Sequence, residues 1–155
     1  MQPAVSVRAR RICVAIALLA VAGAAVSSVS LDHHYGKDKT TYCDLGESFN
    51  CDIVNRSTYS VVLGVPVALI GILGYLSLLA LATIYRSKAE TPAMLLIASL
   101  AGLGFALYLT YIEGFVLTTW CVLCLSSLAM IFAIAVLSGW LAAERVRQSS
   151  RPGSI

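Results

Sequence analysis

Long apolar runs separated by short polar segments dominate the chain. Four runs contain no Asp, Glu, Lys or Arg, and they cover residues 12–31, 57–85, 91–112 and 114–143. An α-helix of roughly 20 residues crosses a hydrocarbon core of about 30 Å, so each run is long enough to span a membrane. We therefore expect an all-α integral membrane protein, a bundle of four transmembrane helices at about 12–31, 60–85, 92–115 and 120–143.

The composition supports a membrane protein and excludes several other classes. Of the 155 residues, 59% are hydrophobic and 12% are charged, and the mean hydropathy is +0.84. In a soluble domain roughly a quarter of the residues are charged, so this chain has about half of the charged residues that a water-facing surface requires. A soluble enzyme, a disordered chain and a nucleic-acid-binding module are therefore excluded.

The basic residues fall mostly on one side of the predicted bundle. Eight of the eleven Lys and Arg residues lie in the two tails or in the link after the second helix, namely Arg8, Arg10, Arg11, Arg86, Lys88, Arg145, Arg147 and Arg151. Cytoplasmic segments carry an excess of Lys and Arg. We therefore expect cytoplasmic tails at 1–11 and 144–155, a membrane domain at 12–143, and an extracytoplasmic loop at 32–59 between the first two helices.

The first apolar run has a second interpretation, as a secretory signal peptide. Arg8, Arg10 and Arg11 precede it, and it contains the small residues Ala24 and Ala25. The run is longer than the usual signal core of roughly 7–15 residues, which favours a retained helix. Cleavage would leave three helices without changing the sidedness of the rest.

Topology also sorts the five cysteines. Cys13 lies at the cytoplasmic end of the first helix and is interpreted as a small buried apolar residue. Cys43 and Cys51 lie in the extracytoplasmic loop, and Cys121 and Cys124 lie where the fourth helix enters the membrane. Four cysteines are thus expected on one side.

The Cys-x-x-Cys motif at the start of the fourth helix predicts redox chemistry. Free amide N–H groups and the helix dipole stabilise an anion there, so Cys121 is expected to have a lowered pKa and to react as a thiolate. Cys124 lies about 4.5 Å deeper on the same face, at about 1.5 Å per residue. One sulfur then faces water and the other faces the bilayer. A structural bridge is the weaker alternative, because so small a loop stabilises little.

Seven residues separate Cys43 from Cys51, and alone this spacing favours a structural loop disulfide. Beside a membrane-level Cys-x-x-Cys it favours a second, mobile dithiol, because disulfide exchange requires one sulfur to reach Cys121. Zinc binding by the four cysteines is disfavoured by the long spacing, and we expect no metal site. His33 and His34, just past the first helix, are interpreted as solvated interfacial residues.

Together these features resemble the vitamin K epoxide reductase family. The resemblance covers residues 10–140 and rests on Cys43-Asp44-Leu45-Gly46 followed by Cys51, on Ser57, and on Cys121-x-x-Cys124. Gly64-Val65-Pro66 and the segment 108–113 are similar to the bacterial branch. Many bacterial members carry a fused thioredoxin-like domain after the last helix, and this chain is expected to use a separate thioredoxin-like protein instead.

The resemblance implies a quinone pocket at the extracytoplasmic end and a role for each cysteine. Cys124 would be the sulfur nearest the quinone, Cys121 would receive electrons from the loop, and Cys43 and Cys51 would take them from the partner through a transient mixed disulfide. The quinone is expected to be of the ubiquinone or menaquinone type. Ser57 matches a family position that hydrogen-bonds near the quinone, although it could equally cap the second helix.

Two expected pocket positions depart from the vertebrate pattern. Leu128 stands where vertebrate members carry a tyrosine that hydrogen-bonds the naphthoquinone, and Ser60 lies near the position of a pocket asparagine. Both changes weaken the case for vitamin K epoxide as the substrate. Glu113 is the one acid close to membrane depth, and it is interpreted either as a proton relay or as an interfacial carboxylate.

The sequence therefore predicts a thiol-disulfide oxidoreductase of a bacterial inner membrane. It would oxidise a periplasmic thioredoxin-like protein, reduce a quinone, and so support disulfide formation in exported proteins. Two alternatives stay open. One is a vitamin K epoxide or quinone reductase, and the other is a non-enzymatic membrane protein whose cysteine pairs are structural.

Overall fold

The computed structural model describes residues 7–36, 46, 48–84 and 88–150. Four longer helices run through it: α1 (Val7–Tyr35), α3 (Val67–Thr83), α4 (Thr91–Ile112) and α5 (Val122–Ser149). Shorter elements connect them: α2 (Cys51–Asn55), a 3₁₀ turn (Thr58–Ser60), strands β1 (Val61–Val62) and β2 (Val65–Pro66), and a π-helical turn (Glu113–Leu117). The described part of the chain is thus mostly helical.

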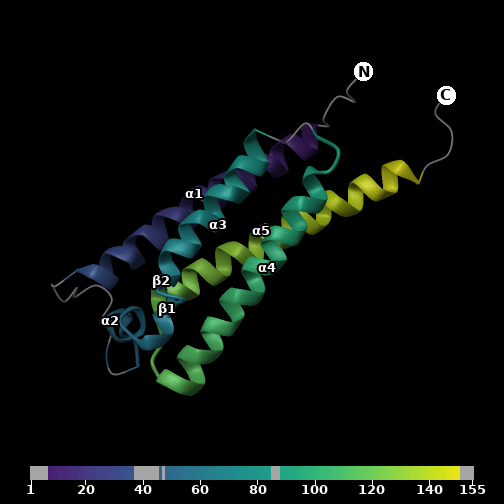
Figure 1. Ribbon diagram of the computed structural model, residues 1–155. Coiled ribbons are helices and arrows are strands. Elements are labelled where there is room, and N and C mark those ends of the chain that lie inside the picture. The colour runs from purple at the N-terminus through teal and green to yellow at the C-terminus, as the bar shows by residue number, and fades with distance from the viewer. Residues whose placement is uncertain (1–6, 37–45, 47, 85–87, 151–155) are drawn as a thin grey trace.

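The long helices form an elongated bundle (Figure 1). α1 packs along α3, and α5 packs against both α1 and α4. The two termini lie at one end of the bundle, while α2 and the β1–β2 hairpin lie at the other. Fully buried apolar side chains such as Ile16, Leu95 and Ile134 join α1, α4 and α5 in a single core. The bundle therefore presents one distinct end on which the small elements gather.

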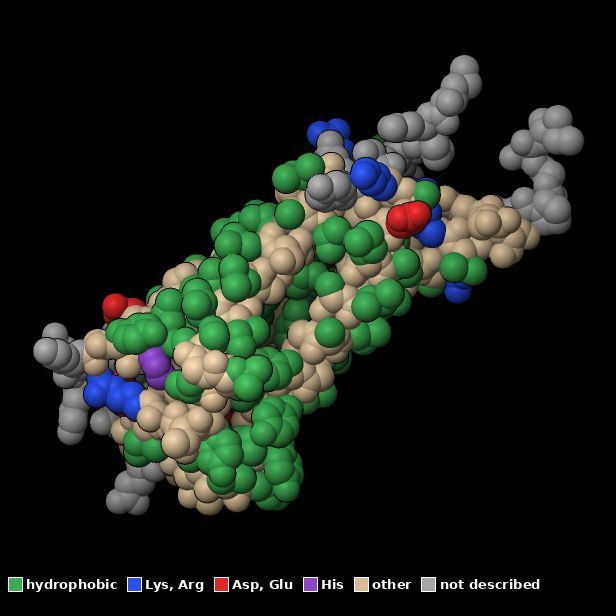
Figure 2. Space-filling view, viewed as in Figure 1, with side chains coloured by type: hydrophobic (Ala, Val, Ile, Leu, Met, Phe, Trp, Pro, Cys, Tyr) green, Lys and Arg blue, Asp and Glu red, His purple; other side chains and the backbone are tan. Residues whose placement is uncertain are grey.

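The surface of the bundle suits a lipid environment. Three stretches are long and apolar enough to cross a membrane: α1, residues Thr91–Leu117 (α4 with the π-helical turn) and α5. α3 is a shorter apolar helix of 17 residues. Large apolar side chains such as Leu18, Ile97 and Phe132 are more than half exposed. Figure 2 shows charged side chains at the two ends of the molecule and an apolar middle. The predicted class, a helical membrane protein, is confirmed, while the four-span count and the orientation of the termini stay predictions.

Two of the helices extend beyond their predicted boundaries. α1 begins at Val7 rather than 12 and continues to Tyr35, and α5 continues past 143 to Ser149. A run without charged residues shows which part of a helix can lie in lipid. The helix itself can continue past the end of that run, because Arg and Glu are good helix formers. The tails 1–11 and 144–155 are accordingly helical in part.

The predicted second helix, 60–85, is wrong at its beginning. Residues 61–66 form a hairpin in which Val61 pairs with Pro66 and Val62 pairs with Val65. Its turn places Leu63 at φ 53° and Gly64 at φ 83°, a conformation that a right-handed helix cannot contain. α3 therefore starts only at Val67, and the connection between α1 and α3 is longer than predicted and contains a helix of its own.

Candidate active site

Cys121 and Cys124 lie at the beginning of α5, as the motif predicts. Cys121 occupies the N-cap position, and its sulfur accepts a hydrogen bond from the backbone N–H of Cys124 at 3.4 Å. Both are free thiols, and Cys121 is fully buried. The hydrogen bond from the Cys124 side chain is the largest cause that lowers the pKa of Cys121 below its ordinary value, and backbone hydrogen bonds add to it. The first cysteine of the motif is therefore the one disposed to react as a thiolate.

Glu113 reaches the same helix start from the end of α4. The backbone there widens into the π-helical turn and then reverses at Thr118, which has φ 50° and ψ 27°. Glu113 is 2% exposed, and its Oε2 accepts the backbone N–H of Cys121 at 3.1 Å. Its Oε1 has no hydrogen-bond partner among the described residues. The carboxylate thus holds the backbone at the start of the motif, and among those residues its second oxygen is without a partner beside the cavity that Cys124 also lines.

A second chain segment is paired with the residues that precede Cys121. The backbone N–H of Trp120 donates to the carbonyl of Ser48 at 2.9 Å, and the N–H of Asn50 donates to the carbonyl of Trp120 at 3.1 Å. Phe49 and Trp120 form a parallel bridge. This short ladder aligns the residues just before Cys51 with those just before Cys121.

Cys51 then begins α2. Asn50 caps this helix, because its side-chain oxygen accepts the N–H of Ile53 at 3.1 Å. Cys51 is disulfide-bonded and fully buried, and it shares one buried cluster with Cys121. The other members of this cluster are Val54, Leu117, Leu123 and Cys124. The structure therefore brings together three of the four predicted site cysteines, and Cys43 lies outside the described residues.

Polar contacts attach α2 to the end of α1. The ring of His33 pairs with the Asp52 carboxylate at 3.1 Å, and Ser30 donates to the side-chain oxygen of Asn55 at 2.7 Å. His34 contacts the carbonyl of Asn55. The prediction of two solvated histidines is wrong for His33, which is 3% exposed, because α2 folds back over it. α2, and Cys51 with it, is held in place by its neighbours on α1.

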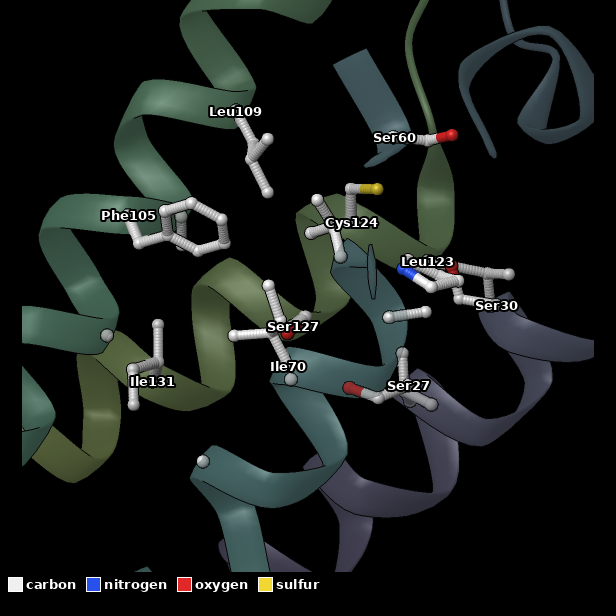
Figure 3. Close-up of a pocket in the computed structure, with 18 of the residues that line it drawn as sticks. Ser27, Ser30, Ser60, Ile70, Phe105, Leu109, Leu123, Cys124, Ser127 and Ile131 are labelled. Atoms are coloured by element: carbon white, nitrogen blue, oxygen red, sulfur yellow. The ribbon is translucent and has the colours of Figure 1, made fainter. Parts of the chain in front are cut away.

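A cavity of about 400 Å³ opens beside Cys124. α1, α3, α4, α5 and the segment 54–60 all contribute to its lining, which is mostly apolar. Figure 3 shows the Cys124 sulfur on the side of the cavity where Ser60 lies, while Phe105 and Leu109 face it from α4. The size and lining are typical of a pocket for an apolar ring molecule with a few polar groups to orient it.

Of the five residues predicted at the quinone pocket, four line this cavity: Cys124, Ser57, Ser60 and Glu113. Ser57 does not cap α3. Its hydroxyl donates to the carbonyl of Val54 at 2.8 Å. Leu128 is not among the described residues that line the cavity, so its prediction as a pocket residue is not supported. The lining face of α5 runs through Leu123, Ser127 and Ile131, and Leu128 belongs to the neighbouring face.

Sequence reasoning missed a Tyr75–Ser127 pair on the cavity wall. The Tyr75 hydroxyl donates to the carbonyl of Ser127 at 2.9 Å and also hydrogen-bonds its side chain at 2.9 Å. The residues lie 52 positions apart, so no local motif connects them. A tyrosine within an otherwise aliphatic helix is the one available signal, because a buried hydroxyl requires a partner.

Fold and site together define a helical membrane protein with a dithiol beside an apolar cavity and a disulfide-bonded cysteine next to it. The family model described as "Vitamin K epoxide reductase family" matches residues 14–139. The chain belongs to this family, and the predicted resemblance is confirmed. It is accordingly a membrane oxidoreductase.

Proposed function

We propose that the protein is a quinone-dependent thiol-disulfide oxidoreductase. Electrons from a separate thioredoxin-like protein enter at Cys43 and Cys51, pass to Cys121 and Cys124, and reduce a quinone held in the cavity. The net reaction converts the partner's dithiol into a disulfide and the quinone into a quinol. Two electrons and two protons are transferred, and disulfide formation in exported proteins follows.

One observation carries this proposal: Cys51 and Cys121 share a buried cluster beside the cavity that Cys124 lines. Thiol-disulfide exchange passes through a mixed disulfide, so sulfurs from the two pairs must come into contact. The Ser48–Trp120–Asn50 ladder keeps the two cysteine-bearing segments aligned. A purely structural pair of disulfides would require neither this proximity nor a cavity.

The cysteines of the two pairs act in a definite order in the proposed reaction. When the dithiol of the structure has been oxidised to a Cys121–Cys124 disulfide, a loop thiolate attacks the Cys121 sulfur and releases Cys124 as a thiolate. The second loop thiolate then attacks the mixed disulfide, which leaves a Cys121–Cys124 dithiol and an oxidised loop. Cys124 faces the cavity and is the sulfur from which electrons leave. A quinone would accept the two electrons, and its apolar ring matches the mostly apolar lining of the cavity.

The cavity supports a quinone in both shape and polarity. Apolar side chains from α3, α4 and α5 can hold a ring and an isoprenoid tail, and Ser57, Ser60 and His34 are polar groups at its edge. His34 lies 3.5 Å from the Ser60 hydroxyl. A small number of polar groups at the edge of an apolar cavity can orient a ligand, and the cavity still accepts a hydrophobic molecule.

The proposed location is a bacterial inner membrane with the cysteine loop on the periplasmic side. The Lys and Arg residues outside the loop favour cytoplasmic termini, and the two termini lie at the same end of the bundle. α3 has 17 residues and is preceded by apolar strands, so a fourth span is proposed for it. Periplasmic disulfides persist because that compartment is oxidising.

The test is turnover of the purified protein with a thioredoxin-like reductant and a soluble quinone. Cys121→Ser and Cys124→Ser should each abolish quinone reduction, while Cys13→Ser, at the opposite end of α1, should leave it unchanged. Cys124→Ser should also accumulate a disulfide between Cys121 and a loop cysteine, identified by peptide mapping. Activity that survives replacement of all four extracytoplasmic cysteines would refute the proposal. Turnover with vitamin K epoxide instead of the quinone would identify the epoxide reductase.

A further inference from the structure

Glu113 is a buried acid that the cysteine relay does not use. It is 2% exposed, lines the cavity together with Cys124, and accepts a hydrogen bond from the backbone N–H of Cys121. Its Oε2 is occupied by the backbone N–H of Cys121, but Oε1 is buried and has no hydrogen-bond partner in the described part of the chain. A buried carboxylate oxygen without a partner is costly, so a proton on it would relieve that cost.

We propose that Glu113 carries the proton of the Cys124 thiol to the quinone, an inference that rests on the proposed function. Oxidation of the dithiol forms the Cys121–Cys124 bond and releases two protons and two electrons, and the quinone takes up two of each. Glu113 accepts the Cys124 proton at Oε1 and donates it to the nearer quinone oxygen. Cys121 reacts as a thiolate and has already given its proton to solvent, and the second quinone oxygen takes a proton from solvent, so protons and electrons balance.

The geometry assigns this task to Glu113 because the acid, the thiol and the cavity meet at one point. Glu113 and Cys124 both line the cavity, and the carboxylate holds the backbone N–H of Cys121, three residues before that thiol. A group within reach of both the proton donor and the proton acceptor is what general acid–base catalysis requires. The low exposure of Glu113 keeps bulk water from competing as the carrier.

An unusual backbone conformation fixes the position of Glu113. A π-helical turn is rare and usually accompanies a functional site, and this one begins at Glu113 itself. The carbonyl of Glu113 accepts the N–H of Thr119 at 3.1 Å, and its carboxylate accepts the N–H of Cys121. The main chain and the side chain of Glu113 thus both stabilise the turn at Thr118, where the backbone reverses before the dithiol.

The matched variants are Glu113→Gln, Glu113→Asp and Glu144→Gln. Glutamine keeps an oxygen for the Cys121 N–H but cannot carry a proton, whereas aspartate can carry one from a shorter side chain. Glu144 lies far along α5 and also has a buried carboxylate oxygen without a partner among the described residues, so it controls for the loss of a buried acid. The titratable groups facing Glu113 are Cys121 and Cys124, and His34, Tyr59 and Tyr75 line other parts of the cavity.

Quinone reduction should be measured in single turnovers across a range of pH, starting from the reduced dithiol. Glu113→Gln should lower the rate by about 10²-fold or more and remove the pH dependence that the acid causes, and Glu113→Asp should restore part of both. Glu144→Gln should match the wild type. A rate and pH profile of Glu113→Gln equal to those of the wild type would overturn the inference.

A second measurement needs no quinone. In infrared spectra of the reduced protein, a protonated-carboxyl band should titrate over the same pH range as the thiolate absorbance, because acid and thiol share a proton. The band should be lost in Glu113→Gln and retained in Glu144→Gln, and a band unaffected by Glu113→Gln would overturn the inference. If the cysteine variants remain active, the proposed function itself fails. If they are inactive while Glu113→Gln behaves as the wild type, only the role of Glu113 fails.

Discussion

The ring of Tyr75 fills the space that a side chain on Gly23 would occupy. A Cβ at Gly23 would lie 2.3 Å from Cε1 of that ring, a distance that requires the ring to move. This close approach of α1 to α3 orients the Tyr75 hydroxyl toward Ser127 on α5. One glycine therefore links three helices at the cavity wall.

Gly23→Ala is expected to destabilise the bundle by about 1–3 kcal/mol, because an added methyl group in a tightly packed site forces neighbours apart. The displaced Tyr75 would also lose its hydrogen bonds to Ser127. The measurement is thermal unfolding in detergent. Gly104→Ala is the matched control, since a Cβ there meets nothing within 4 Å and should stabilise the helix by about 0.5–1 kcal/mol. Equal effects of the two substitutions would contradict this interpretation of the packing.

The cap at Asn50 is expected to hold α2 and therefore Cys51. Asn50→Ala removes the acceptor for the Ile53 N–H and should cost about 1 kcal/mol, whereas Asn50→Asp keeps an acceptor and should cost little. Because α2 has only five residues, loss of its cap should loosen the whole helix. If the proposed relay operates, the rate of electron transfer from the loop pair to Cys121 should fall in Asn50→Ala and not in Asn50→Asp. Hydrogen exchange at the backbone of 51–55 would report the loosening directly, and unchanged exchange would contradict it.

Cys121 is expected to stay a thiolate to lower pH than an ordinary cysteine. The hydrogen bond from Cys124 stabilises the charged sulfur, so Cys124→Ala should raise the pKa of Cys121 back toward its ordinary value. Thiolate absorbance in the ultraviolet measures this shift, in a background where Cys13, Cys43 and Cys51 are replaced. The signal should be lost as pH falls, and at a higher pH in the variant. Coincident titration curves would show that Cys124 does not stabilise the thiolate.

Much of the fold follows from where charges are absent, because the length of an apolar run decides whether a helix fits a membrane. The dithiol at the start of α5 was predictable for a similar reason, since a Cys-x-x-Cys motif and a helix start are both local features. The hairpin was not predictable from polarity. Residues 61–66 are as apolar as a helix, and only the positive φ values at Leu63 and Gly64 turn them into strands.

The features that sequence reasoning missed are contacts between distant segments. His33 was interpreted as solvated because its partner, Asp52, is nineteen residues away and becomes a neighbour only when α2 folds back. Tyr75 and Ser127 meet across two helices. The sequence allows two interpretations of Glu113, because it indicates the depth of this acid in the membrane but not its contact with Cys121. Such pairs depend on how the helices are arranged in three dimensions, and one sequence does not record that arrangement.

The pairing of Ser48 with Trp120 is made by the main chain, since an amide N–H and a carbonyl form it. Side chains on both segments can therefore change over evolution while the two sulfurs keep their mutual position. Proline is the exception, because at position 120 it would remove the N–H that Ser48 accepts. The alignment of the segments that carry Cys51 and Cys121 thus tolerates sequence drift in the side chains around it.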